Sequence, residues 1–311
     1  MKALDPALDW QQIMAAVERA VMPHIGAGKV ADYIPALACV DPRKFGMAVA
    51  LRDGTMRCLG DADERFSVQS ISKVFTLALT LQRVGEALWD AVGREPSGSS
   101  FNSIVQLEAE NGIPRNPLIN AGAIATTDRL VHSYGGGQAG AWEAMDDLLD
   151  TARRLAGDQN IESQSGSRNR ALAHFMASFG NMKNPVEDSL SAYFRHCSIA
   201  ISCRQLARAA LFLAFDGCDP VTGEEVLSKE RCQRILAIMM MSGHYDNSGE
   251  FAYRIGLPGK SGVGGGILVV APGYGTVAGT QSGGHLDGGQ HRAGRACQAD
   301  GLVGFWMTMG V

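Results

Sequence analysis

Strand-like segments lie near both ends of this chain, and the roughly two hundred residues between them have mostly helical character. The first β region has the pattern of a hairpin. Met47–Leu51 and Thr55–Cys58 flank Asp53-Gly54, a pair that supplies the positive φ of a tight turn. The second β region is Gly266–Val270, which ends at Pro272-Gly273. Since strands must find partners, we predict one sheet assembled from distant segments, with a helical subdomain inserted between them.

Apolar residues at helical spacing mark several stretches, which are separated by stops such as Asn116-Pro117 and Asp219-Pro220. One amphipathic helix is expected before the hairpin, from Leu8 to Ile25. The stretches expected to be helical between the two β regions are Val74–Leu88, Ala141–Leu155, Arg170–Phe179, Cys203–Phe215 and Ser228–Met241.

Charge and hydrophobicity exclude several classes of protein. The formal net charge is −4, which gives no long-range attraction for nucleic acid or an anionic membrane. Hydrophobic residues make up 46% of the chain, enough for a core, but no apolar run approaches the ~20 residues that span a bilayer. Asp5 and Pro6 interrupt the N-terminus at once, so it lacks the pattern of a secretory signal. We expect a cytoplasmic protein with no nucleic-acid or membrane partner.

The cysteines and histidines do not have the spacing of metal ligands. The seven cysteines are an odd number and form no C-x-x-C pair; they are Cys39, Cys58, Cys197, Cys203, Cys218, Cys232 and Cys297. Their scatter argues against a disulfide framework or a zinc site, and for a reducing compartment. The histidines show no ligand spacing either, so no metal is predicted.

Ser70 and Lys73, in the run Ser70-Ile71-Ser72-Lys73, are candidates for a nucleophile and its base. If a helix starts near Ser70, the two residues lie one turn apart on one face, and the lysine amine can reach the serine oxygen. Serine is a weak nucleophile until a base removes its proton, and lysine can be that base only if its pKa falls from ~10.4 towards neutrality. The helix N-terminus would also offer amides to an oxyanion.

Alone, Ser-x-x-Lys is a weak signal, because most instances are a capping serine and a solvated lysine. A second element accompanies it here: Lys260-Ser261-Gly262 opens the late strand. Ser-x-x-Lys together with Lys-[Ser/Thr]-Gly is the pairing of penicillin-recognising serine enzymes. The glycines around Val263 suit a close approach of the main chain to a substrate. The two elements together favour a serine acyl-transfer enzyme.

Longer blocks of sequence decide between the serine acyl-transfer families. These blocks are Ala31–Pro35, Phe66–Lys73, Phe101–Ser103, Asn116–Ile124 and Gly256–Ile267. In their order and spacing the chain resembles the serine-dependent glutaminase family, whose fold is related to that of β-lactamases and transpeptidases. The resemblance runs from about Ala31 to Gly273, roughly four-fifths of the chain.

The resemblance implies a reaction and roles for the catalytic residues. Ser70 would attack the side-chain amide carbon of L-glutamine, release ammonia and form a γ-glutamyl ester that water hydrolyses. Lys73 would be the base, and Tyr245 would pass the proton to the leaving ammonia. The backbone N–H groups of Ser70 and Val263 would form the oxyanion hole. Lys260, Ser261 and Gly262 would support the site structurally, and no cofactor is implied.

The resemblance also implies how the substrate is held. Glu162 and Asn169 would bind its α-amino end, Asn120 and Tyr193 its α-carboxylate, and Tyr33 would close the pocket. These roles make physical sense, because an amino acid carries a cation and an anion on one carbon. The residue types by themselves would fit ordinary roles equally well: packing for the two tyrosines, a surface loop charge for Glu162 and a turn for Asn120.

The implied fold is the α+β serine β-lactamase/transpeptidase-like architecture: a mainly antiparallel sheet flanked by helices, plus a helical subdomain. We expect a single domain, with a sheet subdomain over about 1–69 and 250–275 and a helical subdomain over about 74–245. Residues 275–311 form an atypical C-terminal segment. The family further implies a homo-oligomer, a homotetramer or a dimer.

The resemblance is expected to fail after about Tyr274. Eleven of the last forty-one residues are glycine, and such density opposes both strand and helix on grounds of backbone entropy. Our hypothesis is a shifted reading frame near the 3′ end of the gene, which translation of the genomic DNA in the other two frames would test. The run Leu302–Met307 would then be an exposed apolar patch.

Two alternative functions stay open from the sequence. One is a penicillin-recognising hydrolase, which shares Ser70, Lys73 and the Lys260 element. Tyr245-Asp246-Asn247 even resembles its Tyr-x-Asn element, but lies fifteen residues ahead of Lys260 instead of far before it. The other alternative is a catalytically inactive relative that acts as a binding or scaffold protein. The complete set of catalytic residues argues against it, and the unusual C-terminus leaves it possible.

Overall fold

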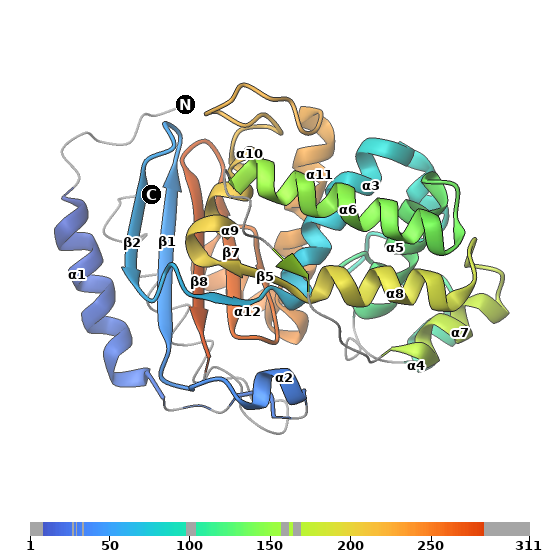
Figure 1. The fold of residues 1–311 in the computed structure, drawn as a ribbon, viewed down its shortest axis with the longest axis horizontal. Coiled ribbons are helices and arrows are strands. Elements are labelled where there is room, and N and C mark those ends of the chain that lie inside the picture. Colours follow the sequence, from blue (N-terminus) through green and yellow to red (C-terminus); the bar gives the residue numbers. More distant parts are fainter. Residues whose placement is uncertain are drawn as a thin grey trace.

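The computed structural model describes residues 9–26, 28, 30–32, 34–97, 104–156, 162–163 and 169–282. Its main sheet has the strand order β2-β1-β8-β7-β6, with every neighbouring pair antiparallel. The strands are β1 (Phe45–Leu51), β2 (Met56–Gly60), β6 (Gly259–Ser261), β7 (Gly266–Ala271) and β8 (Gly275–Gln281). The sheet lies on one side of the molecule and a group of helices on the other (Figure 1). The predicted α+β class and the sheet built from both ends of the chain are confirmed.

Alternation along the strands divides the main sheet into two faces. On β1, Met47 and Val49 belong to one hydrophobic cluster, whereas Ala48 and Ala50 belong to another. This is the period of two that a strand imposes on its side chains. The first cluster includes α1 (Trp10–Val21) and α12 (Ser248–Ile255); the second includes α9 (Cys203–Ala209) and α10 (Leu211–Ala214). The predicted first helix is α1, shorter at both ends than Leu8–Ile25.

The group of helices beside the sheet is organised around α3 (Ser72–Val84), which packs against α5 (Asn120–Ser133), α8 (Val186–Cys197) and α11 (Lys229–Ser242). The predicted division into a sheet subdomain and a helical subdomain stays a prediction. Val74, Leu77 and Leu81 of α3 are fully buried. The remaining described α-helices are α2 (Pro35–Ala38), α4 (Ile104–Ala109), α6 (Gly137–Ala156) and α7 (Arg170–Ser178). Each predicted helical stretch is found. Val74–Leu88 ends in the 3₁₀ turn η3 (Gly85–Asp90), and Cys203–Phe215 is divided between α9 and α10. None of the described helices is long and apolar enough to cross a membrane.

A small second sheet connects segments that are distant in the sequence. Its order is β3-β5-β4, with β3 (Arg65–Ser67), β4 (Glu162–Ser163) and β5 (Ile199–Ser202) all antiparallel. β3 leads into the Ser70 turn, and β5 directly follows the helix that carries Tyr193. The small sheet therefore brings three segments with predicted site residues to one place.

Residues 275–281 correct one expectation. This glycine-containing run was predicted not to form a strand, yet it is β8, paired on both sides with β1 and β7. Small residues are required here, because a Cβ on Gly275 would lie 2.1 Å from the carbonyl oxygen of Ala50. Hydrogen bonding along both edges offsets the propensity cost of glycine, about 0.5–1 kcal/mol per residue. The reading-frame hypothesis was made for the chain after about Tyr274. Residues after Ser282 lie outside the described ones, and for them it stays a prediction.

Asp128 of α5 is a buried carboxylate that holds the loop before α8. Its Oδ1 accepts hydrogen bonds from the backbone N–H of Asn184 at 3.0 Å and from the Ser189 hydroxyl at 2.8 Å. Its Oδ2 accepts from the backbone N–H of Lys183 at 2.8 Å and pairs with Arg129 at 2.5 Å. The Asp128 side chain has no exposed area. Removing it would leave several buried donors without an acceptor.

Asp128→Ala is therefore expected to lower the free energy of unfolding by about 3 kcal/mol or more. Denaturant unfolding followed by circular dichroism measures the change. The matched control is Asp150→Ala, since Asp150 pairs with Arg153 on the surface and its side chain is 72% exposed. The control should change the free energy by at most ~0.5 kcal/mol. Equal effects of the two substitutions would contradict the assigned role of Asp128.

Candidate active site

Ser70 lies in a tight turn at the entrance to α3. The chain leaves β3, passes through the 3₁₀ turn η2 (Gln69–Ile71) and begins the α-helix at Ser72. The helix thus starts two residues later than Ser70, and the serine occupies the turn before it. Ser70 is 8% exposed. Gln69 has φ +48°, a left-handed value that non-glycine residues adopt at an energetic cost.

Lys73, one turn further on, is almost completely buried. Its Nζ donates to the carbonyl of Leu118 at 3.2 Å and to Oδ1 of Asn120 at 2.7 Å. Burial disfavours the charged amine and lowers the pKa of Lys73 to about 8. The sequence required a lysine with a lowered pKa at this place, and the structure provides it through burial.

Asn120 brings several predicted site residues together at the start of α5. Its Oδ1 also accepts from the Tyr193 hydroxyl at 3.3 Å, and its Nδ2 donates to Oδ1 of Asn169 at 3.3 Å. Tyr193 is 3% exposed, and burial raises the pKa of its hydroxyl. One amide thus connects Lys73, Tyr193 and Asn169 in a polar cluster.

Lys260 is the second buried lysine, and it lies on the short edge strand β6, not at the start of the longer β7 as the sequence indicated. Its Nζ donates to the carbonyls of Gly243 at 2.9 Å and Ser261 at 2.6 Å. The same Nζ lies 4.3 Å from the centre of the Tyr245 ring. Burial, and then the positive charge of Lys73, hold the pKa of Lys260 well below its usual value. Tyr245 begins the turn η4 (Tyr245–Asn247) with φ +53°.

The β6–β7 turn carries Val263 and lies against the segment that leads to Ser70. Two hydrogen bonds close the turn: Gly262 N–H to Gly266 O at 2.8 Å and Gly265 N–H to Gly262 O at 3.1 Å. A Cβ on Gly264 would lie 2.7 Å from the carbonyl oxygen of Ser67. Glycine therefore allows the turn to reach the nucleophile segment, and the two predicted oxyanion residues stand on adjoining stretches of backbone.

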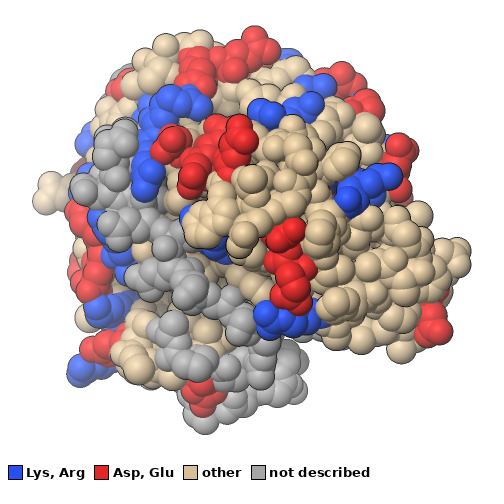
Figure 2. All heavy atoms as spheres, turned by 45° about the vertical axis from the view of Figure 1, so that its right-hand side comes forward, with Lys and Arg blue, Asp and Glu red and all other residues tan. Residues whose placement is uncertain are grey.

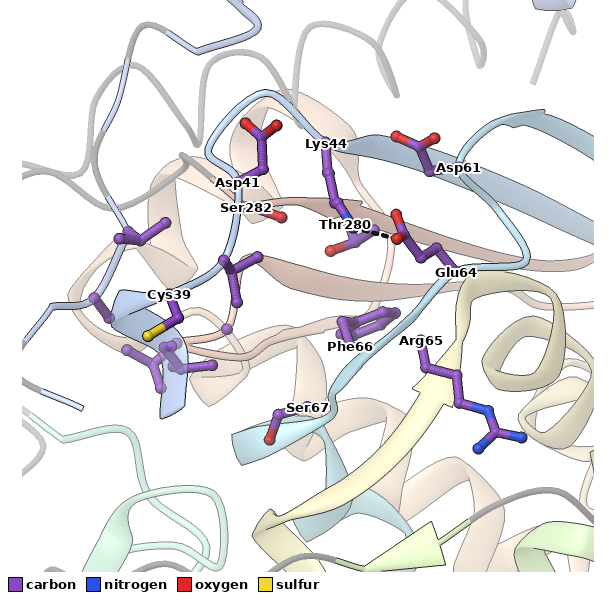
Figure 3. Close-up of a pocket in the computed structure, with 16 residues that line it drawn as sticks. Cys39, Asp41, Lys44, Asp61, Glu64, Arg65, Phe66, Ser67, Thr280 and Ser282 are labelled. Atoms are coloured by element: carbon purple, nitrogen blue, oxygen red, sulfur yellow. Dashed lines mark hydrogen bonds and ion pairs between the residues drawn. The ribbon is translucent and has the colours of Figure 1, made fainter. Parts of the chain in front are cut away.

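The larger cavity and the chemical centre do not coincide. A cavity of about 390 Å³ borders Ser67, Val263 and Gly264, but Ser70, Lys73 and Tyr245 are not among its lining residues. Figure 3 shows its charged rim, where Lys44 pairs with Glu64 while Arg65 points away. A hollow of only about 10 Å³ borders Leu118 and Tyr245. The buried lysine and its polar partners, not cavity size, mark the site.

Some predicted residues are placed only in part. Glu162 is on β4, opposite Ala200 of β5, which puts its backbone in the small sheet. Tyr33 and the Phe101–Ser103 block lie outside the described residues. No group of three or more His, Cys, Asp or Glu side chains that could hold a metal ion occurs in the described part of the chain.

Sequence reasoning missed a buried histidine behind the nucleophile turn. His196 of α8 contacts Ser72 and Thr127, which are 124 and 69 residues away in the chain. No spacing signal could reveal such a group, because its members come from three helices. Only the packing of α3, α5 and α8 brings them together.

The sequence and the fold were compared with those of known proteins. The family model described as Glutaminase matches residues 28–282. The chain belongs to the glutaminase family. The match extends beyond both ends of the predicted resemblance and includes β8, so the expectation that it fails after Tyr274 was wrong.

Relatives in the glutaminase family match most of the chain. A glutaminase of Rhizobium rhizogenes is 53% identical over 87% of this chain and 89% of its own length. A thermolabile glutaminase of Rhizobium etli is 55% identical over the same shares. Among solved structures, a probable glutaminase, ybaS, superposes with a TM-score of 0.84 at 35% identity, over 97% of this chain and 98% of its own. The predicted serine-dependent glutaminase family and β-lactamase-like fold are confirmed.

Proposed function

We propose that this chain hydrolyses L-glutamine to L-glutamate and ammonia through a γ-glutamyl ester on Ser70. Membership of the glutaminase family supports the reaction. A similar solved structure, Mglu, which has a TM-score of 0.82 and 33% identity, was obtained in a form with tris and glutamate. The observation that carries the mechanism is the buried amine of Lys73, whose pKa of about 8 makes it a base near neutral pH.

The contacts of Lys73 leave it able to accept a proton. A neutral amine has two N–H bonds and one lone pair. Leu118 O and Asn120 Oδ1 take the two hydrogen bonds, so the lone pair is free to receive the proton of Ser70. The Asn120 amide thus orients the base while it also contacts Tyr193.

The proposed acylation begins when Ser70 Oγ loses its proton to Lys73 Nζ and forms a bond to the side-chain amide carbon. The carbonyl electron pair moves to oxygen, where the backbone N–H groups of Ser70 and Val263 stabilise it. Tyr245 then protonates the amide nitrogen as the C–N bond breaks, and ammonia leaves. The Lys73 ammonium restores the proton of Tyr245.

Deacylation reverses the roles with water. Lys73 takes a proton from water, whose oxygen attacks the ester carbon, and the oxyanion collapses to release L-glutamate. The proton returns to Ser70 Oγ, so protons and electrons balance over the cycle. Lys260, through Gly243 O and Ser261 O, ties the Tyr245 segment to β6. In this proposal it is a structural support together with Ser261 and Gly262.

We infer the amino-acid contacts from the same polar cluster. Tyr193 would donate to the α-carboxylate in place of its present bond to Asn120 Oδ1, and Asn120 would donate to the α-carboxylate from Nδ2. Asn169, joined to Asn120, and Glu162 would hold the α-ammonium group. Tyr33 would close the pocket.

The test is ammonia release by the purified protein from L-glutamine, with L-asparagine and a chromogenic β-lactam as comparison substrates. Ammonia from glutamine without β-lactam hydrolysis is the expected result. Hydrolysis of the β-lactam alone would favour the penicillin-recognising alternative. No turnover of any of the three by a folded protein would favour the inactive relative.

The pH dependence should report Lys73. Its base form is the neutral amine, so kcat/KM is expected to rise with pH and level off above about 8. A profile measured in a constant-ionic-strength buffer series, with protein stability checked at each pH, provides the test. A rate that falls as pH rises from 6 to 8 would contradict Lys73 as the base.

Assembly of the chain into a homo-oligomer, a tetramer or a dimer, stays a prediction, and so does its cytoplasmic location.

On the face of the molecule seen in Figure 2, acidic and basic side chains are interspersed with neutral ones.

A further inference from the structure

His196 makes two hydrogen-bond contacts behind the nucleophile turn. Its side chain is buried, with Nδ1 at 2.7 Å from Ser72 Oγ and Nε2 at 3.1 Å from Thr127 Oγ1. The Cys197 sulfur lies 3.7 Å from the same Nδ1 and is the more distant of its two neighbours. The ring also packs edge-on against Tyr193, with centroids 5.1 Å apart. Because none of these contacts is used in the proposed reaction, they call for a separate explanation.

Which partner donates in each contact depends on which ring nitrogen of His196 carries the proton. Burial, and then the nearby Lys73, lower the pKa of His196 to about 3, so the ring is neutral and carries one N–H. Ser72 Oγ lies 2.7 Å from Gln69 O and Thr127 Oγ1 lies 2.8 Å from Ala123 O, and the single ring N–H allows only one of these hydroxyls to keep its carbonyl bond. We place the N–H on Nδ1, the nitrogen with the shorter contact, so that Ser72 Oγ accepts from Nδ1–H and donates to Gln69 O, while Thr127 donates to Nε2.

The carbonyl of Gln69 and the N–H of Ser70 belong to one peptide group. In a planar trans peptide these two bonds point in opposite directions, so fixing the carbonyl also fixes the N–H. The Gln69 carbonyl accepts from the Ser72 backbone N–H and from the Ser72 hydroxyl. Gln69 itself has a φ of +48°, an unfavourable value that persists only where the surrounding structure holds it.

We propose that His196 is a positioning residue, which acts through the Ser72 hydroxyl to hold the Gln69–Ser70 peptide so that the Ser70 N–H points at the developing oxyanion. This inference rests on the proposed role of Ser70. The hydrogen-bonded relay runs from His196 Nδ1–H to Ser72 Oγ–H to Gln69 O, and touches neither substrate nor the reacting atoms. It should therefore affect the transition state more than ground-state binding.

The kinetic test compares Ser72→Ala, His196→Leu and His196→Asn in ammonia release from glutamine. Ser72→Ala and His196→Leu are expected to lower kcat about tenfold or more while KM changes by less than about threefold. His196→Asn keeps an N–H near the position of Nδ1 and should recover most of the lost kcat. The double variant Ser72→Ala/His196→Leu should lose no more than the worse single variant, because both break one relay.

Thr80→Val is the matched control. Thr80 is a buried hydroxyl on the same helix, and its Oγ1 donates to Thr76 O at 2.7 Å. Its substitution should leave kcat within about twofold, as expected for a hydroxyl without a role in positioning. Unchanged kcat in Ser72→Ala, or an equal loss in Thr80→Val, would overturn the proposal. So would a failure of His196→Asn to improve on a folded His196→Leu.

A second measurement does not depend on catalysis. The sequence contains three Gln-Ser pairs, at 69–70, 164–165 and 281–282. Carbonyl-¹³C glutamine with ¹⁵N serine therefore selects three amide signals, and the one missing in Ser70→Ala is that of Ser70. This signal should move in His196→Leu and return towards the wild-type position in His196→Asn. If wild type releases no ammonia, the proposed function fails, and this signal alone decides: a Ser70 amide unmoved in His196→Leu would overturn the positioning role.

Discussion

Ser70→Ala is expected to abolish ammonia release from glutamine, with kcat reduced by about 10⁴-fold or more. The Ser70 hydroxyl oxygen is the atom that forms the proposed ester, so its removal leaves the proposed reaction without its nucleophile. The fold should be retained, because Ser70 contributes one small side chain to a turn that backbone hydrogen bonds of Val68 hold at both ends.

The measurement is ammonia production at saturating glutamine, with thermal unfolding recorded on the same preparations. Ser178→Ala is a suitable control, since that serine donates only within α7, to Phe175 O at 2.7 Å. Its activity should equal that of wild type. Near-normal turnover in a folded Ser70→Ala variant would refute the nucleophile and, with it, the ester.

Lys73→Met should lower kcat/KM by roughly 10²–10⁴-fold, the usual contribution of a positioned general base. Methionine fills similar space without the amine, so the buried surroundings can stay packed. Lys229→Met is the control, because that side chain is 66% exposed and pairs with Asp216 at the surface. It should leave kcat/KM unchanged, and an equal loss in both variants would contradict the assignment.

The stability of Lys73→Met provides an independent check on the buried amine. The pKa of Lys73 is about 8 in the folded chain, whereas a solvated lysine in the unfolded chain has a pKa of 10.5. The unfolded chain therefore binds this proton more tightly. The amine therefore costs stability below about pH 8, and this cost shrinks as pH rises from 8 towards 10.5. Wild type should gain stability relative to Lys73→Met over that range. A constant difference between the two would mean that the amine is not desolvated.

Local sequence patterns were sufficient for much of the fold. Asp53-Gly54 predicted the β1–β2 hairpin, and Gly266–Val270 predicted β7, because turn chemistry and apolar runs act over a few residues. β8 was missed for the opposite reason. Its glycines disfavour a strand locally, but pairing with β1 and β7 and close contact with Ala50 O favour small residues there. Tertiary context overrode propensity.

The sequence by itself determined the chemical identities at the site: Ser70 and Lys73 one turn apart, a second lysine at 260, and blocks that belong to one family. It could not determine the state of those groups. The lowered pKa of Lys73 comes from burial, which depends on how distant segments pack around its side chain. His196 came to light only through the packing of α3, α5 and α8, because hydrogen bonds across three helices leave no periodic trace in a sequence.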